Sequence, residues 1–198
     1  MIDLLQRITN ADYLHNNLSF VSLYIAVYEH VVDYVISNVK SLLCDVCVEN
    51  GEIVYPISDQ YKIQILKRIV DEHGNKNDPT RASFLWLVDN DAITKSEYEL
   101  FLNIKGIRNK YAHELMDVIC QGAEESEQEL FVALLTLYKK IASWFYMNVE
   151  VPIMGYSLPS ASEQIDVHTG TNFILNVILE VLYNGKADEY QKILNDLT

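Results

Sequence analysis

The sequence predicts an all-α protein, a helical bundle of about four or five helices with a C-terminal helical extension. Apolar residues recur at helical spacing through several long stretches. Chain-breaking residues are sparse, with 7 Gly and 4 Pro among 198 residues, and sparse punctuation favours long helices over many-turned sheets. Apolar residues make up 49% of the chain and aromatic residues 11%, a composition typical of an ordered globular domain.

A chain of 198 residues can bury a sizeable core in one domain with a small appendage. We expect residues 1–147 to form the bundle. Residues 148–198 are expected to form an irregular connection and a C-terminal helical extension packed on the bundle. The four Gly and Pro residues between 152 and 170 predict the connection. Apolar patterns then predict helices at 172–183 and 187–197.

The first long helix is predicted from about Asp12 to Leu43, after a short lead over residues 1–10. It is apolar on two sides, which places it at the centre of the bundle or at a subunit interface. Glu29 lies on the second apolar face, where we expect it to pair with a lysine or a tyrosine hydroxyl. A supporting role in a catalytic site is the alternative reading. The two apolar rows are Phe20, Leu23, Tyr24, Val27, Val31, Tyr34 and Val35, and Val21, Ile25, Val32 and Ile36.

Turn and cap signals divide the middle of the chain. Residues 49–52 read Glu-Asn-Gly-Glu, a turn, and residues 53–55 form a short extended piece. A second helix is predicted over 58–70, and a loop follows it. Asp78, as an N-cap before Pro79, then begins a third helix that continues to about Val88.

A capping box at Thr94 and Glu97 begins the next helix, predicted to reach about Ile119. We expect it to pack through a set of apolar side chains that includes Leu115. The last helix of the bundle is predicted over 130–147. In the helix that begins after Thr94, the side chains expected to face the core are Tyr98, Phe101, Leu102, Ile104, Tyr111 and Leu115.

The helix that begins after Thr94 contains a polar segment with Arg108, Asn109 and His113, and the functional prediction depends on this segment. At about 100° per residue, Arg108 and His113 point about 140° apart, whereas Asn109 and His113 share one face. One copy therefore does not bring the arginine and the histidine together, but two facing copies could. Lys105 precedes the segment and Lys110 lies within it, and both are candidate phosphate-binding residues.

The segment resembles the signature of the HEPN superfamily of all-helical domains, in which Arg, four to six residues and His follow one another and Asn often comes after Arg. The resemblance implies a metal-independent endoribonuclease with a composite site in a homodimer, Arg108 and His113 being catalytic. Asn109 would bind phosphate or orient the imidazole, and Glu29 and Tyr111 would support the site. The resemblance further implies RNA as substrate, a toxin–antitoxin or antiphage role and an antitoxin or regulatory partner.

Two other readings stay open. The mannitol operon repressor family is similar and carries a comparable Arg-Asn…Ala-His segment, which implies a non-catalytic helical regulator or protein-binding module. Leu115 stands where many small toxin members have tyrosine, and this favours the regulator. In the simplest reading, Arg108 pairs with a carboxylate and His113 is a core histidine.

The remaining features exclude several classes of protein. A net charge of −13 opposes tight non-specific binding to duplex DNA. Cys44, Cys47 and Cys120 indicate a reduced cytoplasm rather than secretion, and the CxxC at Cys44 lacks the further ligands of a zinc site. Charged residues such as Glu29 and Asp33 interrupt the apolar runs, so no membrane span is predicted. No nucleotide-binding or hydrolase motif is present, and we expect neither metal nor cofactor.

Overall fold

The computed structural model describes residues 2–69, 78–155, 178 and 180. The chain divides into two compact units, Met1–Ile141 and Ala142–Thr198, so the division falls a few residues before the expected boundary at 147. The predicted helices at 172–183 and 187–197 lie outside the described residues, apart from residues 178 and 180.

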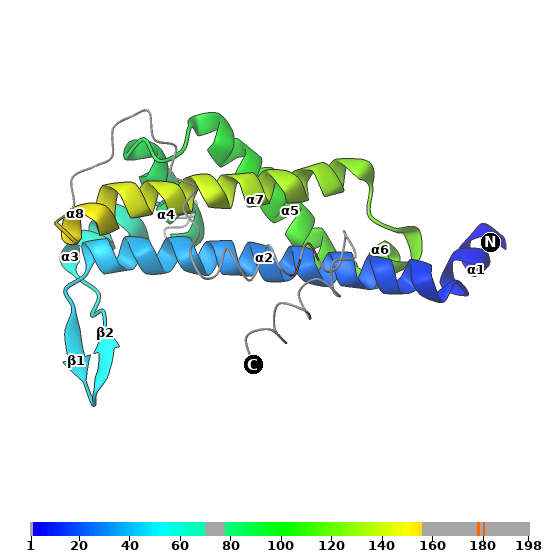
Figure 1. The fold of residues 1–198 in the computed structure, drawn as a ribbon, viewed down its shortest axis with the longest axis horizontal. Helices are drawn as coiled ribbons and strands as arrows, with labels where there is room; N and C mark the ends of the chain where they lie inside the picture. Colours follow the sequence, from blue (N-terminus) through cyan, green and yellow to red (C-terminus); the bar gives the residue numbers. More distant parts are fainter. Residues whose placement is uncertain (1, 70–77, 156–177, 179, 181–198) are drawn as a thin grey trace, which may run out of the picture. The chain divides into compact units, whose positions relative to one another are not determined.

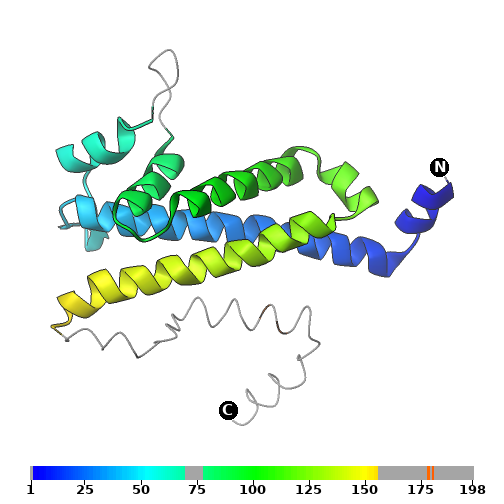
Figure 2. The same cartoon turned by 90° about the horizontal axis from the view of Figure 1, so that it is seen from above.

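The prediction of an all-α fold is confirmed. The first unit consists of helices and a small two-stranded sheet; α7 runs beside α2, and α5 packs on α2 at an oblique angle (Figures 1 and 2). The elements in order are α1 (Ile2–Ile8), α2 (Ala11–Leu43), β1 (Cys47–Glu49), β2 (Glu52–Val54), α3 (Asp59–Tyr61), the π-helix η1 (Lys62–Leu66), α4 (Pro79–Asp89), α5 (Lys95–His113), α6 (Leu115–Gln121), α7 (Glu125–Phe145), the π-helix η2 (Tyr146–Glu150) and α8 (Val151–Ile153).

Helix α2 is the centre of the first unit, as its two apolar faces predict. It packs on α1, α3, α4, α5 and α6, and its buried side chains run from Phe20 to Leu43. An aromatic cluster joins it to its neighbours: Tyr24 lies edge-on to Tyr111 of α5 at 5.1 Å between ring centroids, and Phe20 lies edge-on to Phe131 of α7 at 5.5 Å. Edge-to-face pairs of this kind stabilise a core beyond the area they bury.

The predicted turn at residues 49–52 closes a β-hairpin. Asn50 and Gly51 both have positive φ, 54° and 85°, the conformation of a two-residue hairpin turn. The sequence indicated the extended piece after the turn but not β1 before it. In the register, Val48 faces Ile53 and Glu49 faces Glu52. The hairpin projects away from the end of α2 (Figure 1).

The predicted helix starts in the middle of the chain are confirmed. Ser58 caps α3 by accepting from the Tyr61 backbone N–H, and Asp78 caps α4 by accepting from the Arg81 N–H, with Pro79 in the first turn. Thr94 and Glu97 form both hydrogen bonds of a capping box at the start of α5. Each cap satisfies backbone donors that a helix start leaves unpaired.

Replacing Thr94 by alanine removes the acceptor for the Glu97 N–H and is expected to lower the free energy of unfolding by about 1 kcal/mol. Urea unfolding followed by circular dichroism measures this change. Thr136→Ala is the matched control, because the Thr136 hydroxyl donates to the Val132 carbonyl within α7 and caps no helix. Equal stability of Thr94→Ala and wild type would contradict the assigned role of the cap.

The predicted continuation of the motif helix to Ile119 is wrong. Helix α5 ends at His113, and Glu114, with φ −118° and ψ 29°, turns the chain into α6. Tertiary packing explains the turn, because α6 packs on α1 and α2. There, Tyr13 and Asn17 of α2 donate to the carbonyls of Cys120 and Ile119. Leu115, expected in the core, is 39% exposed as a result.

Helix α7 begins in the first unit and ends in the second. Leu134, Leu137 and Ile141, which recur at helical spacing, are fully or almost fully buried. In the second unit, Trp144 and Phe145 pack edge-on at 5.2 Å. The chain continues as η2 and α8. Residues 148–153 are therefore helical, and the prediction that they form part of an irregular connection is wrong.

Among the residues that the structure describes, two helical stretches, Ala11–Leu43 and Glu125–Ile153, are long and apolar enough to cross a membrane, judged by length and composition alone. The charged residues in these two stretches are therefore too few to exclude a membrane span by length and composition. The core helices of proteins that dissolve in water meet the same criterion, and α2 buries part of its apolar rows in the first unit, including Val27, Val31 and Val35.

Candidate functional site

Arg108 projects from α5 toward α2 and is held there by Glu29. Its Nε donates to Glu29 Oε1 at 2.6 Å, and its Nη2 donates to the same oxygen. The guanidinium also lies over the Tyr28 ring, 5.8 Å from the centroid. Two hydrogen bonds and a contact with an aromatic ring fix the direction of the guanidinium more firmly than a single ion pair would.

Glu29 therefore has a charged partner, as expected for a carboxylate on an apolar face, although the partner is Arg108 rather than a lysine or a tyrosine hydroxyl. The simplest reading of Arg108, an arginine paired with a carboxylate, describes this contact. The side chains remain partly accessible, at 30% for Arg108 and 42% for Glu29. Solvent can thus reach the pair.

Asn109 extends the polar cluster toward solvent. It is exposed, and its Oδ1 accepts a hydrogen bond from Arg108 Nη1 at 3.2 Å. Its side-chain NH2 group donates to no other residue within the described part of the chain. Arg108 and Asn109 together present donors in one small region of α5.

His113 is the last residue of α5 and is exposed, so it is not a core histidine. It lies one helical turn beyond Asn109 on the same side of α5. No hydrogen bond or ion pair of His113 is found within the part of the chain that the structure describes. The imidazole is therefore open to a ligand or to a second molecule.

Two lysines of α5 that were expected to bind phosphate each contact a carboxylate. Lys105 Nζ lies 2.9 Å from Asp78 Oδ2, and Lys110 Nζ lies 2.7 Å from Glu127 Oε1. With Arg108, three cations of the helix thus have an anionic partner. Such pairing reduces the positive potential that a phosphate backbone would meet.

Glu127, at the start of α7, is the most deeply buried charged group at the site, with 2% of the residue exposed. Its carboxylate accepts from Lys110 Nζ, from the Tyr111 hydroxyl at 2.9 Å and from the Glu124 backbone N–H at 3.0 Å. Burial acts to raise the pKa of Glu127, but the three hydrogen bonds outweigh it and lower the pKa below its usual value. The carboxylate thus fastens the end of α5 to α7.

Burial and the Glu127 carboxylate raise the pKa of Tyr111, and the hydrogen bond to Glu127 raises the pKa of Lys110. Tyr111, fully buried, stays protonated and donates to Glu127. It therefore supports the helix that carries His113.

The sequence did not indicate Glu127, Tyr28 or Asp78 as neighbours of the motif. Glu127 lies in an acidic stretch of the sequence, residues 124–129. Its position three residues after Glu124 is the spacing at which a glutamate side chain reaches back to a helix-start N–H, a signal that could have indicated its role. Among the described residues, no group of three or more His, Cys, Asp or Glu side chains could hold a metal ion.

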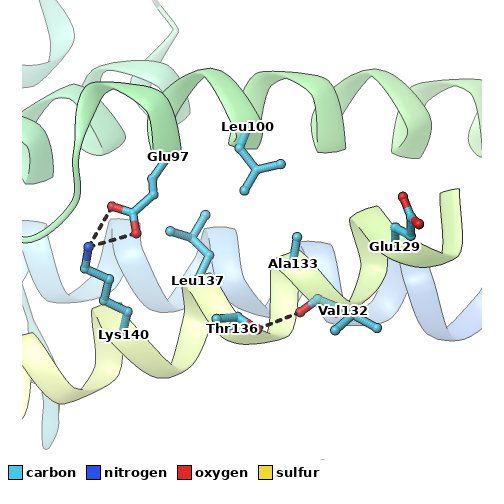
Figure 3. A pocket seen from close by; sticks show the side chains of 8 residues that line it. All are labelled: Glu97, Leu100, Glu129, Val132, Ala133, Thr136, Leu137 and Lys140. Atoms are coloured by element: carbon cyan, nitrogen blue, oxygen red, sulfur yellow. Dashed lines mark hydrogen bonds and ion pairs between the residues drawn. The ribbon is translucent and has the colours of Figure 1, made fainter. Parts of the chain in front are cut away.

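A separate shallow groove of about 360 Å³ lies between α5 and α7, and no motif residue lines it. Figure 3 shows its apolar floor, with Leu100 on α5 and Val132 and Ala133 on α7. The ion pair of Glu97 and Lys140, 2.7 Å, closes one end.

Comparison with protein-family models, with curated proteins and with solved structures finds no match to this chain.

The contact between Arg108 and Glu29 is expected to contribute about 1 kcal/mol in a double-mutant cycle, the upper end for partly exposed pairs, because one carboxylate oxygen accepts two arginine hydrogen bonds. The cycle compares Glu29→Gln, Arg108→Gln and the double variant by urea unfolding. A matched cycle on the more exposed pair of Lys62 and Asp59 should give a much smaller coupling. Equal coupling in the two cycles would contradict the fixed orientation of Arg108.

Proposed function

We propose that this chain is a HEPN-like, metal-independent endoribonuclease that cleaves RNA at a composite site in a homodimer. The observation that carries the proposal is the arrangement on α5: a guanidinium with a fixed direction at Arg108 and an open imidazole at His113. The imidazole lies on the same side of the helix as Asn109. A second copy, placed with its α5 against the first, would supply the other arginine and histidine.

In this mechanism the RNA 2′-hydroxyl attacks the adjacent phosphorus, and the bond from phosphorus to the 5′-oxygen breaks. One His113 takes the 2′-hydroxyl proton, and the His113 of the other copy donates a proton to the leaving 5′-oxygen. Imidazole suits both roles because its ordinary pKa lies near neutrality. Arg108 supplies positive charge to the phosphorane-like transition state, and Asn109 donates to a phosphate oxygen or orients the imidazole.

The direct test incubates the purified full chain with a single-stranded RNA of mixed sequence in the presence of EDTA. The expected products carry 2′,3′-cyclic phosphate and 5′-hydroxyl ends, because the 2′-oxygen is the nucleophile. Light scattering on the same sample should give the mass of a dimer. Intact RNA, or cleavage that EDTA abolishes, would overturn the proposal.

A second candidate is a non-catalytic helical regulator or protein-binding module of the same fold. The pairing of Lys105, Arg108 and Lys110 with carboxylates favours it, because little unpaired positive charge is left on α5 for RNA. In this case, an Arg108→Ala variant should retain the binding of a basic protein partner, and the wild type should leave RNA intact under all metal conditions.

A further inference from the structure

One face of the hairpin formed by β1 and β2 carries apolar side chains that no other described part of the chain covers. Val48 and Ile53 are direct cross-strand partners and are 69% and 66% exposed. Val46 precedes Val48 by two residues, hence lies on the same side of the chain, and is 60% exposed. β-Branched side chains that share a sheet face normally pack against something.

The edge of β1 is also open. The sheet has two strands within the described residues. Across a two-residue turn, Glu49 and Glu52 form the hydrogen-bonded pair, so the next pair, Val48 and Ile53, directs its backbone N–H and C=O groups outward. β1 contains neither Pro nor Lys, the residues that commonly block a free edge. A further strand could therefore pair with β1 through the backbone of Val48.

The opposite face of the hairpin is acidic. Glu49 and Glu52 are direct cross-strand partners, and like charges in this position destabilise a sheet. Neither carboxylate forms an ion pair with another described residue. Asp45, two residues before Cys47, alternates onto the same side and is exposed. A strand added at β1 would relieve this repulsion if it brought cations to that face.

We propose that the edge of β1 binds an extended segment of another protein in which apolar and basic residues alternate. Its apolar side chains extend the face of Val48 and Ile53, and its lysine or arginine side chains lie beside Glu49 and Glu52. This is strand addition, in which backbone hydrogen bonds supply affinity and alternate side chains supply specificity.

Charge disfavours a second copy of this chain as the occupant. Antiparallel pairing of two β1 strands about Val48 would add the Glu49 and Glu52 of the second copy to an already acidic face.

The test titrates isotope-labelled full-length protein with short synthetic peptides and follows the backbone amide resonances. A peptide of alternating valine and lysine should shift the resonances of Val48 and Ile53 and saturate at one peptide per chain. Two control peptides should not do so: one with the same composition but with valines and lysines in separate blocks, and one of alternating valine and glutamate. The block peptide separates strand pairing from general attraction to an acidic protein.

Two variants locate the site. The double variant Glu49→Gln, Glu52→Gln should bind the alternating peptide about tenfold more weakly, since two opposite-charge pairs are lost. Val48→Asp should abolish binding, whereas Val132→Asp on α7, where valine is 61% exposed, should bind as wild type does. Equal binding of block and alternating peptides, or no binding, would overturn the proposal. So would self-association of the free protein with shifts at Val48, which would show that a second copy covers β1.

Discussion

The His113→Ala variant is expected to cleave single-stranded RNA about 10²- to 10⁴-fold more slowly than wild type, the contribution of a positioned general acid or base. The imidazole is exposed at the end of α5 and forms no hydrogen bond with another described residue. Its removal should therefore leave folding intact. Initial rates on a fluorescently labelled RNA, with the midpoint of thermal unfolding measured in parallel, check both expectations.

His15→Ala is the matched control, because His15 is also an exposed histidine on a helix of the same unit. This variant should cleave as wild type does. A composite site adds a sharper criterion: because the proposed reaction uses the His113 of both copies, an excess of His113→Ala mixed with wild type should lower the activity of the wild type, since mixed dimers keep only one of the two imidazoles. Full activity of His113→Ala would rule out the ribonuclease proposal.

Replacing Glu127 by alanine is expected to lower the free energy of unfolding by about 2–3 kcal/mol, because buried hydrogen-bond donors lose their acceptor. The substitution leaves the Tyr111 hydroxyl, fully buried in α5, without its acceptor. It also leaves the Lys110 ammonium and the Glu124 N–H without the partner they share. Urea unfolding at neutral pH measures the change, and Glu129→Ala, an exposed glutamate on the same helix, should change stability little.

Glu127 also gives stability a pH dependence of known sign. Its pKa in the folded protein is below the usual value, because the hydrogen bonds to the carboxylate outweigh its burial. The contribution to stability is therefore complete above the pKa of the unfolded chain and is lost as pH falls through the lower pKa of the folded state. Wild type should lose more stability between neutral and acid pH than Glu127→Gln does. The same acid dependence in both proteins would contradict this assignment.

Local signals in the sequence predicted much of the fold. Asp78 with Pro79, and Thr94 with Glu97, determined where α4 and α5 begin, because a cap is formed by residues only a few positions apart. The apolar rows likewise predicted α2. Features that depend on distant contacts were missed. Helix α5 stops at His113 without a glycine or proline, since contacts of α6 with α1 and α2 turn the chain.

For the candidate site too, the sequence predicted what depends on neighbouring residues and missed what depends on distant contacts. The motif indicated Arg108, Asn109 and His113 from their spacing, and Glu29 was singled out because a carboxylate on an apolar face needs a partner. That this partner is Arg108 could not be predicted, because the two residues are 79 positions apart in the chain. Helix packing alone brings them together.

The central position of α2 has a consequence for synthesis of the protein. Residues that cover its apolar rows belong to α4, α5 and α6 and, at Phe131 and Tyr138, to α7, and all of these helices leave the ribosome after α2 does. A nascent chain that stops at the hairpin would therefore expose both rows to water, with the energetic penalty that apolar surface carries there. We expect chains truncated before residue 79 to aggregate or to be held by chaperones, whereas chains extended through α6 can bury the rows that face these helices.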